Sequence, residues 1–216
     1  MRSGVRLTGA IVAVMAAILV AAPVAAAGPW TVSRETGTRA SAHSSDECAD
    51  NPDGSVTCDS ESVHAFKGRI KPPGEAKRKS EHVCYHRSSY TFDPNTGNSI
   101  AHHERFGCTD DAGTLTVNGL RSIRLAPTVI ALMAIECDES GECTESEAGS
   151  TTLRGTWTGA GPISRHTTRS RFDDGTCVLV HVEKGRSRGA SFEGSFDATD
   201  SQIGEGNFTF RTNCTI

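Results

Sequence analysis

From residue 47 onward, short apolar runs alternate with polar turn sequences, a pattern typical of β-strands joined by tight turns. The runs are rich in Thr, Val, Ile, Phe and Tyr, and turn sequences such as NPDG (51–54), DPNTG (93–97) and TGAG (158–161) separate them. Pro, Asn, Asp and Gly favour turns, whereas β-branched and aromatic residues favour strands. Apolar residues do not recur at the 3.6-residue period of an amphipathic helix. We therefore expect an all-β protein of antiparallel hairpin and meander strands.

The most apolar stretch after the N-terminal region is PTVIALMAIEC, residues 127–137. It is short, contains β-branched residues and ends in a cysteine, all of which favour a strand over a helix. A continuous apolar run without alternation is typical of a strand buried on both faces. We expect a central strand of that kind here.

Residues 1–27 have the features of a signal peptide. Arg2 and Arg6 precede an uncharged apolar run from Leu7 to Val20, and the small residues of PVAAA (23–27) follow it. This order is that of an export signal with its cleavage site. A membrane anchor is the alternative, but the apolar run is short and Gly9 interrupts it. We expect cleavage near Ala27 and a secreted protein with no membrane segment after cleavage.

Residues 28–46 are small and polar, with no hydrophobic period. Such a composition predicts a flexible N-terminal arm. The Ala- and Val-rich leader and the preference for Arg over Lys indicate a bacterial protein.

Two similar acidic, cysteine-closed turns divide the remaining chain: ECADNPDGSVTC (47–58) and ECDESGEC (136–143). Downstream of them, the FKG sequence at 66–68 matches LRG at 153–155, and Phe92 matches Phe172. We expect two tandem β-meander repeats, over 47–136 and 137–216, which form a sandwich or barrel as one joint domain (47–216) or as two small domains. The alternative is that Gly- and Thr-rich hairpins resemble each other by composition.

All eight cysteines follow the leader. An even number in an exported chain predicts four disulfides, and the absence of a Cys-x-x-Cys pair argues against a zinc ribbon or a thioredoxin-like motif. Because cysteines at equal distances from a turn face each other across a hairpin, the predicted pairs are Cys48–Cys58, Cys84–Cys108 and Cys137–Cys143. Cys177 and Cys214 then remain for each other.

The predicted Cys84–Cys108 pair also sets the register of its hairpin. In that register, one face carries the apolar side chains of Tyr90, Phe92, Ile100 and Phe106. The other face carries the polar side chains of Arg87, Ser89, His103 and Arg105. A slip of one residue would exchange the two faces.

The formal net charge is −4 for the whole chain, and loss of the two leader arginines makes it −6. Proteins that bind nucleic acid are usually basic, so no nucleic-acid partner is expected. Aromatic residues make up only 6% of the chain. The core is therefore sparse, and each disulfide is expected to contribute roughly 2–4 kcal/mol of stability.

Charge is unevenly distributed along the sequence. Acidic residues gather at 138–147, and basic residues gather at 67–79. Arg165, Arg169 and Arg171 alternate along one predicted strand and so share one face of it. These residues are either solvated strand edges or a binding face for an anionic partner.

Motifs for catalysis are not recognised in the sequence: it has no G-x-S-x-G, H-E-x-x-H, phosphate loop or dinucleotide fingerprint. We therefore predict no catalytic residue and no cofactor. If Asp174-Gly175 is a two-residue turn, His166 lies opposite Glu183, and His181 lies diagonal to His166. These three side chains would form either a divalent metal site or a surface His–Glu contact.

Three classes of function are compatible with this pattern. The favoured class is a non-catalytic extracellular binding module that contacts an extracellular protein or a cell-wall polymer through loops and charged strand faces. The alternatives are a secreted hydrolase with a dispersed Glu/His site and a structural component of the cell envelope. Whether the protein is an enzyme is left open by the sequence.

Overall fold

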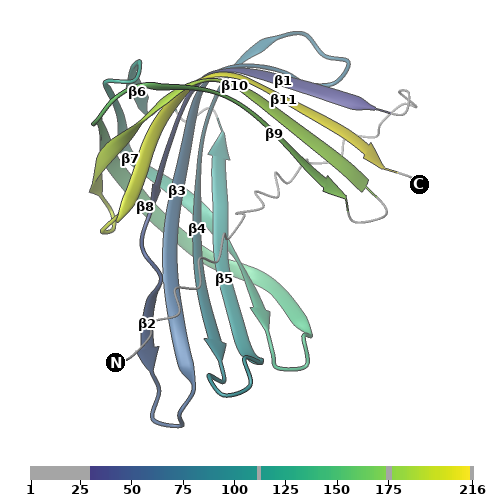
Figure 1. Cartoon of the computed structure of the whole chain (residues 1–216), viewed down its shortest axis with the longest axis vertical. Helices are drawn as coiled ribbons and strands as arrows, with labels where there is room; N and C mark the ends of the chain where they lie inside the picture. Colours follow the sequence, from purple (N-terminus) through teal and green to yellow (C-terminus); the bar gives the residue numbers. More distant parts are fainter. Residues whose placement is uncertain (1–29, 111–112, 174–176, 215–216) are drawn as a thin grey trace, which may run out of the picture.

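The computed structural model describes residues 30–110, 113–173 and 177–214 (Figure 1). They form an antiparallel sheet of eleven strands, which confirms the all-β prediction. The strands are β1 (Thr31–His43), β2 (Glu47–Asp50), β3 (Val56–Lys71), β4 (Arg78–Phe92), β5 (Ser99–Asp110), β6 (Leu115–Asn118), β7 (Ser122–Cys137), β8 (Cys143–Gly159), β9 (Ser164–Asp173), β10 (Cys177–Gly194) and β11 (Asp200–Cys214). Within the described ranges, no helix is long and apolar enough to cross a membrane. The predicted signal peptide, residues 1–27, lies outside them.

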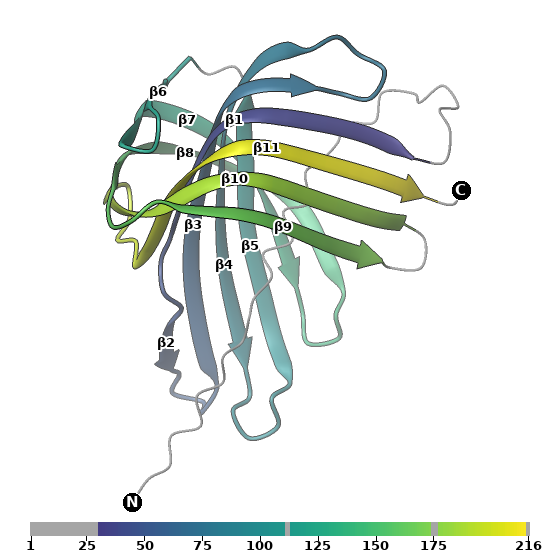
Figure 2. The same cartoon turned by 45° about the horizontal axis from the view of Figure 1, so that its top comes forward.

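Eight of the strands pair in a closed ring. The path β1–β11–β10–β8–β7–β5–β4–β3 is completed by pairing of β1 with β3. The other three strands pair with strands of this ring: β2 with β3, β6 with β7 and β9 with β10. A closed ring removes the unpaired edges that make open sheets prone to aggregate. In Figures 1 and 2 the strands diverge into two arms. We call β9, β10, β11, the N-terminal half of β1 and the adjoining ends of β3 and β4 the upper arm. The descending parts of β2–β5 and the β7–β8 hairpin are the lower arm.

The expected flexible arm over 28–46 is wrong for most of its length. Residues 31–43 form β1, which pairs with β11 throughout and with β3 from Arg34 to His43. Ala40 and Ala42 are almost fully buried, at 3% and 1% exposure. The close packing of neighbouring strands leaves room only for small side chains at these positions. The same small side chains give the segment its low hydrophobicity, which is why it was predicted to be flexible.

The prediction that residues 127–137 are buried on both faces is also wrong. Along β7 the burial alternates: Ile130 is fully buried, whereas Val129 is 64% exposed. In an antiparallel sheet with one core, only one face of each strand is covered. That core lies on the inner face of the ring and includes Val63, Val83 and Trp157.

The two predicted repeats differ in strand pairing. β3 pairs with β4, but β8, which would be the counterpart of β3, pairs with β7 and β10 and not with β9. Phe92 and Phe172 both lie near strand ends, in β4 and β9. The tandem repeat, the sandwich or barrel, and the division of 47–216 into one domain or two stay predictions.

Disulfides join Cys48 to Cys58, Cys84 to Cys108 and Cys137 to Cys143, the pairs that hairpin symmetry predicted. In each case the two cysteines are direct register partners in neighbouring strands. Cys177 is disulfide-bonded and is the register partner of Cys214. The side chain of Cys214 lies outside the described residues, so the Cys177–Cys214 bond stays a prediction.

Four glycines lie side by side across neighbouring strands: Gly68 in β3, Gly37 in β1, Gly206 in β11 and Gly185 in β10. We call them the glycine row. A Cβ atom at any of them would collide with a backbone oxygen of the adjacent strand, at 2.6 Å in the case of Gly206. Glycines of this kind permit a sheet to curve sharply, and the strands of the row curve strongly in both views.

Candidate functional site

The three arginines of β9 do share one face. Arg165, Arg169 and Arg171 alternate along the strand, and all three are exposed. Among the described strands β9 pairs with β10 alone, and the register carries the same face across β10, β11, β1, β3 and β4. The arginines predicted from the sequence are therefore the margin of a larger surface.

We call this surface the basic face. Its Lys and Arg residues are Arg34, Lys67, Arg69, Lys71, Lys79, Arg165, Arg169, Arg171, Lys184, Arg186 and Arg211. They stand in rows that run across the strands. Because successive rows are two residues apart along each strand, they are separated by about 7 Å.

The first row is nearly neutral. It runs through Arg165, Arg186, Glu205, Thr38, Lys67 and Glu81. Arg186 forms an ion pair with Glu205, and Lys67 Nζ lies 2.8 Å from Glu81 Oε2. Burial raises the pKa of Glu81, but hydrogen bonds from Lys67 and from the backbone N–H of Leu115 outweigh burial, and the pKa lies below its usual value.

The second and third rows are purely basic. The second row contains Lys184, Arg69 and Lys79, and the third contains Arg169, Arg34 and Lys71; their other members are uncharged. Within the described part of the chain, none of these six side chains forms an ion pair. Adjacent charges of one sign produce a surface potential that attracts anions.

A shallow groove crosses the strands between the first and second rows. It is lined by Thr36, Gly37, Thr38, Arg165, His166, Thr167, Lys184, Gly185, Arg186, Glu205, Gly206 and Asn207. Three members of the glycine row lie along it, so a ligand meets backbone between the two rows of side chains. Thr36 Oγ1 donates a hydrogen bond to Asn207 Oδ1 at 2.9 Å.

The predicted cluster of His166, His181 and Glu183 is only partly assembled. His166 Nε2 lies 2.7 Å from Glu183 Oε1, but the residue opposite His166 is Gly185. The register differs by two residues from the predicted one because pairing begins at Asp173 and Val178; the expected turn at 174–175 lies outside the described residues. His181 is four positions from Gly185 and stacks on Phe210, with ring centroids 4.7 Å apart. The described residues contain no group of three side chains suited to a metal ion.

The acidic loop between β7 and β8 closes on itself. Asp138 accepts hydrogen bonds from the hydroxyl and backbone N–H of Ser140 and from the backbone N–H of Glu142. The Ser140 hydroxyl is the main cause that lowers the pKa of Asp138. This carboxylate therefore stabilises its own turn, at the end of the lower arm (Figure 1).

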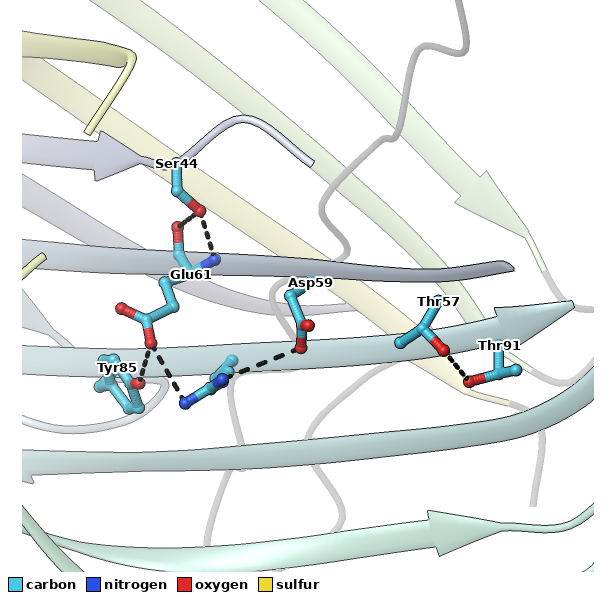
Figure 3. A network of polar contacts seen from close by, with 7 residues as sticks. Ser44, Thr57, Asp59, Glu61, Tyr85 and Thr91 are labelled. Atoms are coloured by element: carbon cyan, nitrogen blue, oxygen red, sulfur yellow. Dashed lines mark hydrogen bonds and ion pairs between the residues drawn. The ribbon is translucent and has the colours of Figure 1, made fainter. Parts of the chain in front are cut away.

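A second polar region lines the lower arm between β3 and β4 (Figure 3). Tyr85 donates to Glu61 Oε1 at 3.2 Å, and the backbone N–H of Glu61 donates to Ser44 Oγ at 2.7 Å. Arg87 lies 3.6 Å from Glu61 and 3.9 Å from Asp59. Burial raises the pKa of Tyr85 to about 12, so the phenol keeps its proton and remains a donor. The sequence placed Arg87 on a polar face but did not identify this network, because Ser44 reaches it from outside the hairpin.

Comparison with known proteins adds no functional information. No protein-family model matches the sequence, and the search of curated proteins finds no match.

Proposed function

We propose that this protein is a non-catalytic binding module that holds an anionic extracellular partner on the basic face. The observation that carries the proposal is the pair of purely basic rows, six unpaired cationic side chains on the surface of a chain whose net charge is −4. Exposed like charges repel each other, and an anionic partner would relieve that repulsion. The partner is either a cell-wall polymer or an acidic protein.

The disulfide bonds support the proposed extracellular location. Three disulfides are consistent with an extracellular protein, because such bonds persist in oxidising compartments. We further propose that residues 1–27 are a signal peptide of a bacterial precursor. N-terminal sequencing of the secreted product should then begin near Gly28, and a retained leader would contradict this assignment.

The test of the function is a pull-down from cell walls and from culture fluid at low and high salt. Exposed charges are screened beyond about 10 Å at 0.1 M ionic strength, so captured material should be released by salt. Protease treatment of the captured material distinguishes a protein partner from a polymer. Capture that resists salt and survives reversal of the third-row charges would overturn the proposal.

A second candidate function is supported by two contacts of His166. Ser187 Oγ lies 3.5 Å from His166 Nδ1, and His166 Nε2 lies 2.7 Å from Glu183, an order of nucleophile, base and orienting carboxylate found in acyl hydrolases. In that reaction Ser187 would attack a carbonyl while His166 takes its proton and later returns it to the leaving group. However, β10 is paired on both sides of Ser187, so nearby backbone N–H groups are engaged in the sheet rather than in an oxyanion hole.

Labelling with a fluorophosphonate tests this second candidate. Hydrolase activity predicts covalent modification of wild type that is lost in Ser187→Ala. Absence of labelling, or labelling unchanged in Ser187→Ala, would eliminate it and leave the binding function.

A further inference from the structure

A hollow in the lower arm is lined by Asp59, Arg87, Ser89, His103 and Arg105. We propose that it is a second, separate binding site, which takes the carboxylate group of a small extracellular ligand. It lies on the inner face of the sheet below the core and shares no residue with the basic face.

Register places the cationic groups of the hollow side by side. Arg87 in β4 lies directly opposite Arg105 in β5, and Ser89 lies opposite His103 one step along the same face. Like charges directly opposite each other destabilise a sheet. Asp59 and Glu61 offset part of this repulsion on the side of Arg87, and an anion bound beside Arg105 would offset the rest.

Arg87 is held in place by its surroundings. Asp59 and Glu61 flank its guanidinium group, and Glu61 is itself fixed by Tyr85 and Ser44 (Figure 3). Tyr85 is only 8% exposed and belongs to the core cluster that borders the hollow. These two ion pairs restrict the Arg87 side chain before any ligand binds, which lowers the entropic cost of binding.

The other donors of the hollow are uncommitted. In the described part of the chain, the Arg105 guanidinium group and the Ser89 hydroxyl form no hydrogen bond or ion pair. His103 contacts Glu136 through Nδ1 at 3.9 Å, which leaves Nε2 free. Guanidinium groups bind carboxylates through paired hydrogen bonds. Asp59 and Glu61 already pair with Arg87, so Arg105 is the arginine of the lining to which a bound carboxylate would add an anionic partner.

The experiment is an NMR titration of the folded protein with sodium acetate, in which chloride is replaced so that ionic strength stays constant. The expected result is a saturable shift of the Arg105 side-chain Nε–H and of the Ser89 and His103 amides. Arg105→Gln should weaken acetate binding about ten-fold, since it removes a charge-assisted hydrogen-bond donor, and Ser89→Ala should weaken it a few-fold. The matched control is Arg124→Gln, an exposed arginine on β7 outside both sites, which should bind acetate as wild type does.

Three results would overturn the site: shifts that rise linearly without saturation, equal acetate affinity in Arg105→Gln, or saturation by sulfate at lower concentration than by acetate. The dispersion of the amide spectrum reports whether each variant is folded, and Arg105→Lys, which retains the charge, should bind more tightly than Arg105→Gln. Charge reversal on the basic face should leave the acetate titration unchanged. Failure of this site is therefore distinguishable from failure of the proposed polymer or protein binding.

Discussion

Arg39 and Glu35 form an ion pair within a single strand, with Arg39 Nη2 2.5 Å from Glu35 Oε2. Residues four positions apart in an extended strand have Cα atoms about 13 Å apart, so these two long side chains meet above Gly37, which carries no side chain between them. The Arg39 guanidinium group also covers the Phe208 ring, 3.5 Å from its centroid. Arg39 and Glu35 alternate along β1 with Arg34 and Thr38, so they lie on the opposite side of the strand from the basic face. The basic face continues along the same side of β1 to the core residues Ala40 and Ala42.

The close approach of neighbouring strands at the glycine row predicts a difference between two glycines of β11 that are two residues apart on one face. A Cβ at Gly206 would lie 2.6 Å from Lys184 O, whereas a Cβ at Gly204 would meet its nearest neighbour at 3.7 Å. Gly206→Ala should lower the free energy of unfolding by about 1–3 kcal/mol, as overpacking does. Gly204→Ala, the matched control, should change it by less than about 0.5 kcal/mol or raise it. Urea unfolding measures both, and equal effects would show that the sheet does not need glycine in the glycine row.

The disulfides should differ in their contribution to stability. Cys84–Cys108 closes a loop with a sequence separation of 24, and Cys137–Cys143 closes one of 6. From loop entropy, paired Cys→Ser substitutions should cost about 3.5 kcal/mol in the first case and about 2.4 kcal/mol in the second. Urea unfolding of the two double variants tests the order, which would be contradicted if the short loop cost more.

Stability should fall in mild acid because of His64. Burial, together with the neighbouring His43 and Arg39, lowers the pKa of His64 to about 4. Below its ordinary pKa of 6.5 the unfolded chain takes up a proton that the folded protein does not, so the free energy of unfolding decreases as pH falls from 6.5 toward 4. The expected loss between about pH 7.5 and about pH 5 is on the order of 2 kcal/mol.

The control for this pH dependence is His64→Gln, which should show a smaller loss over the same range. Some dependence should remain, since burial also lowers the pKa of His82 and His181. An identical pH dependence of stability in wild type and His64→Gln would show that His64 has the same pKa in the folded and the unfolded state.

The local features of the fold were predictable because they depend on neighbours in sequence. Turn residues located the hairpins, and the symmetric positions of Cys84 and Cys108 set a register that places Arg87 opposite Arg105 and Ser89 opposite His103. That register was sufficient to collect four of the residues that line the hollow of the lower arm.

The features that failed depend on contacts distant in sequence. β1 joins β3 to β11, and its partner strand β11 lies more than 150 residues away along the chain, as for the pair Arg34 and Thr209. The alanines of β1 favoured a prediction of disorder because the residues that they pack against are not close to them in sequence. The basic face was predicted as three arginines of β9, since Arg34 and Lys71 join it only through the β1–β3 pairing. Basic residues that are far apart in sequence form one surface only when their strands pair in the ring.

The most direct test of the binding function is a titration of a poly(glycerol phosphate) chain, with neutral dextran as the control ligand. We expect wild type to bind the phosphate polymer and not dextran, with affinity that falls as salt rises from about 0.05 M to about 0.5 M. The third-row variant Arg34→Glu/Lys71→Glu/Arg169→Glu should lose at least about ten-fold in affinity, whereas Arg124→Glu, off the basic face, should bind as wild type does. Binding that is insensitive to salt, or equal in the third-row variant and Arg124→Glu, would contradict the assignment of the basic face as the binding surface.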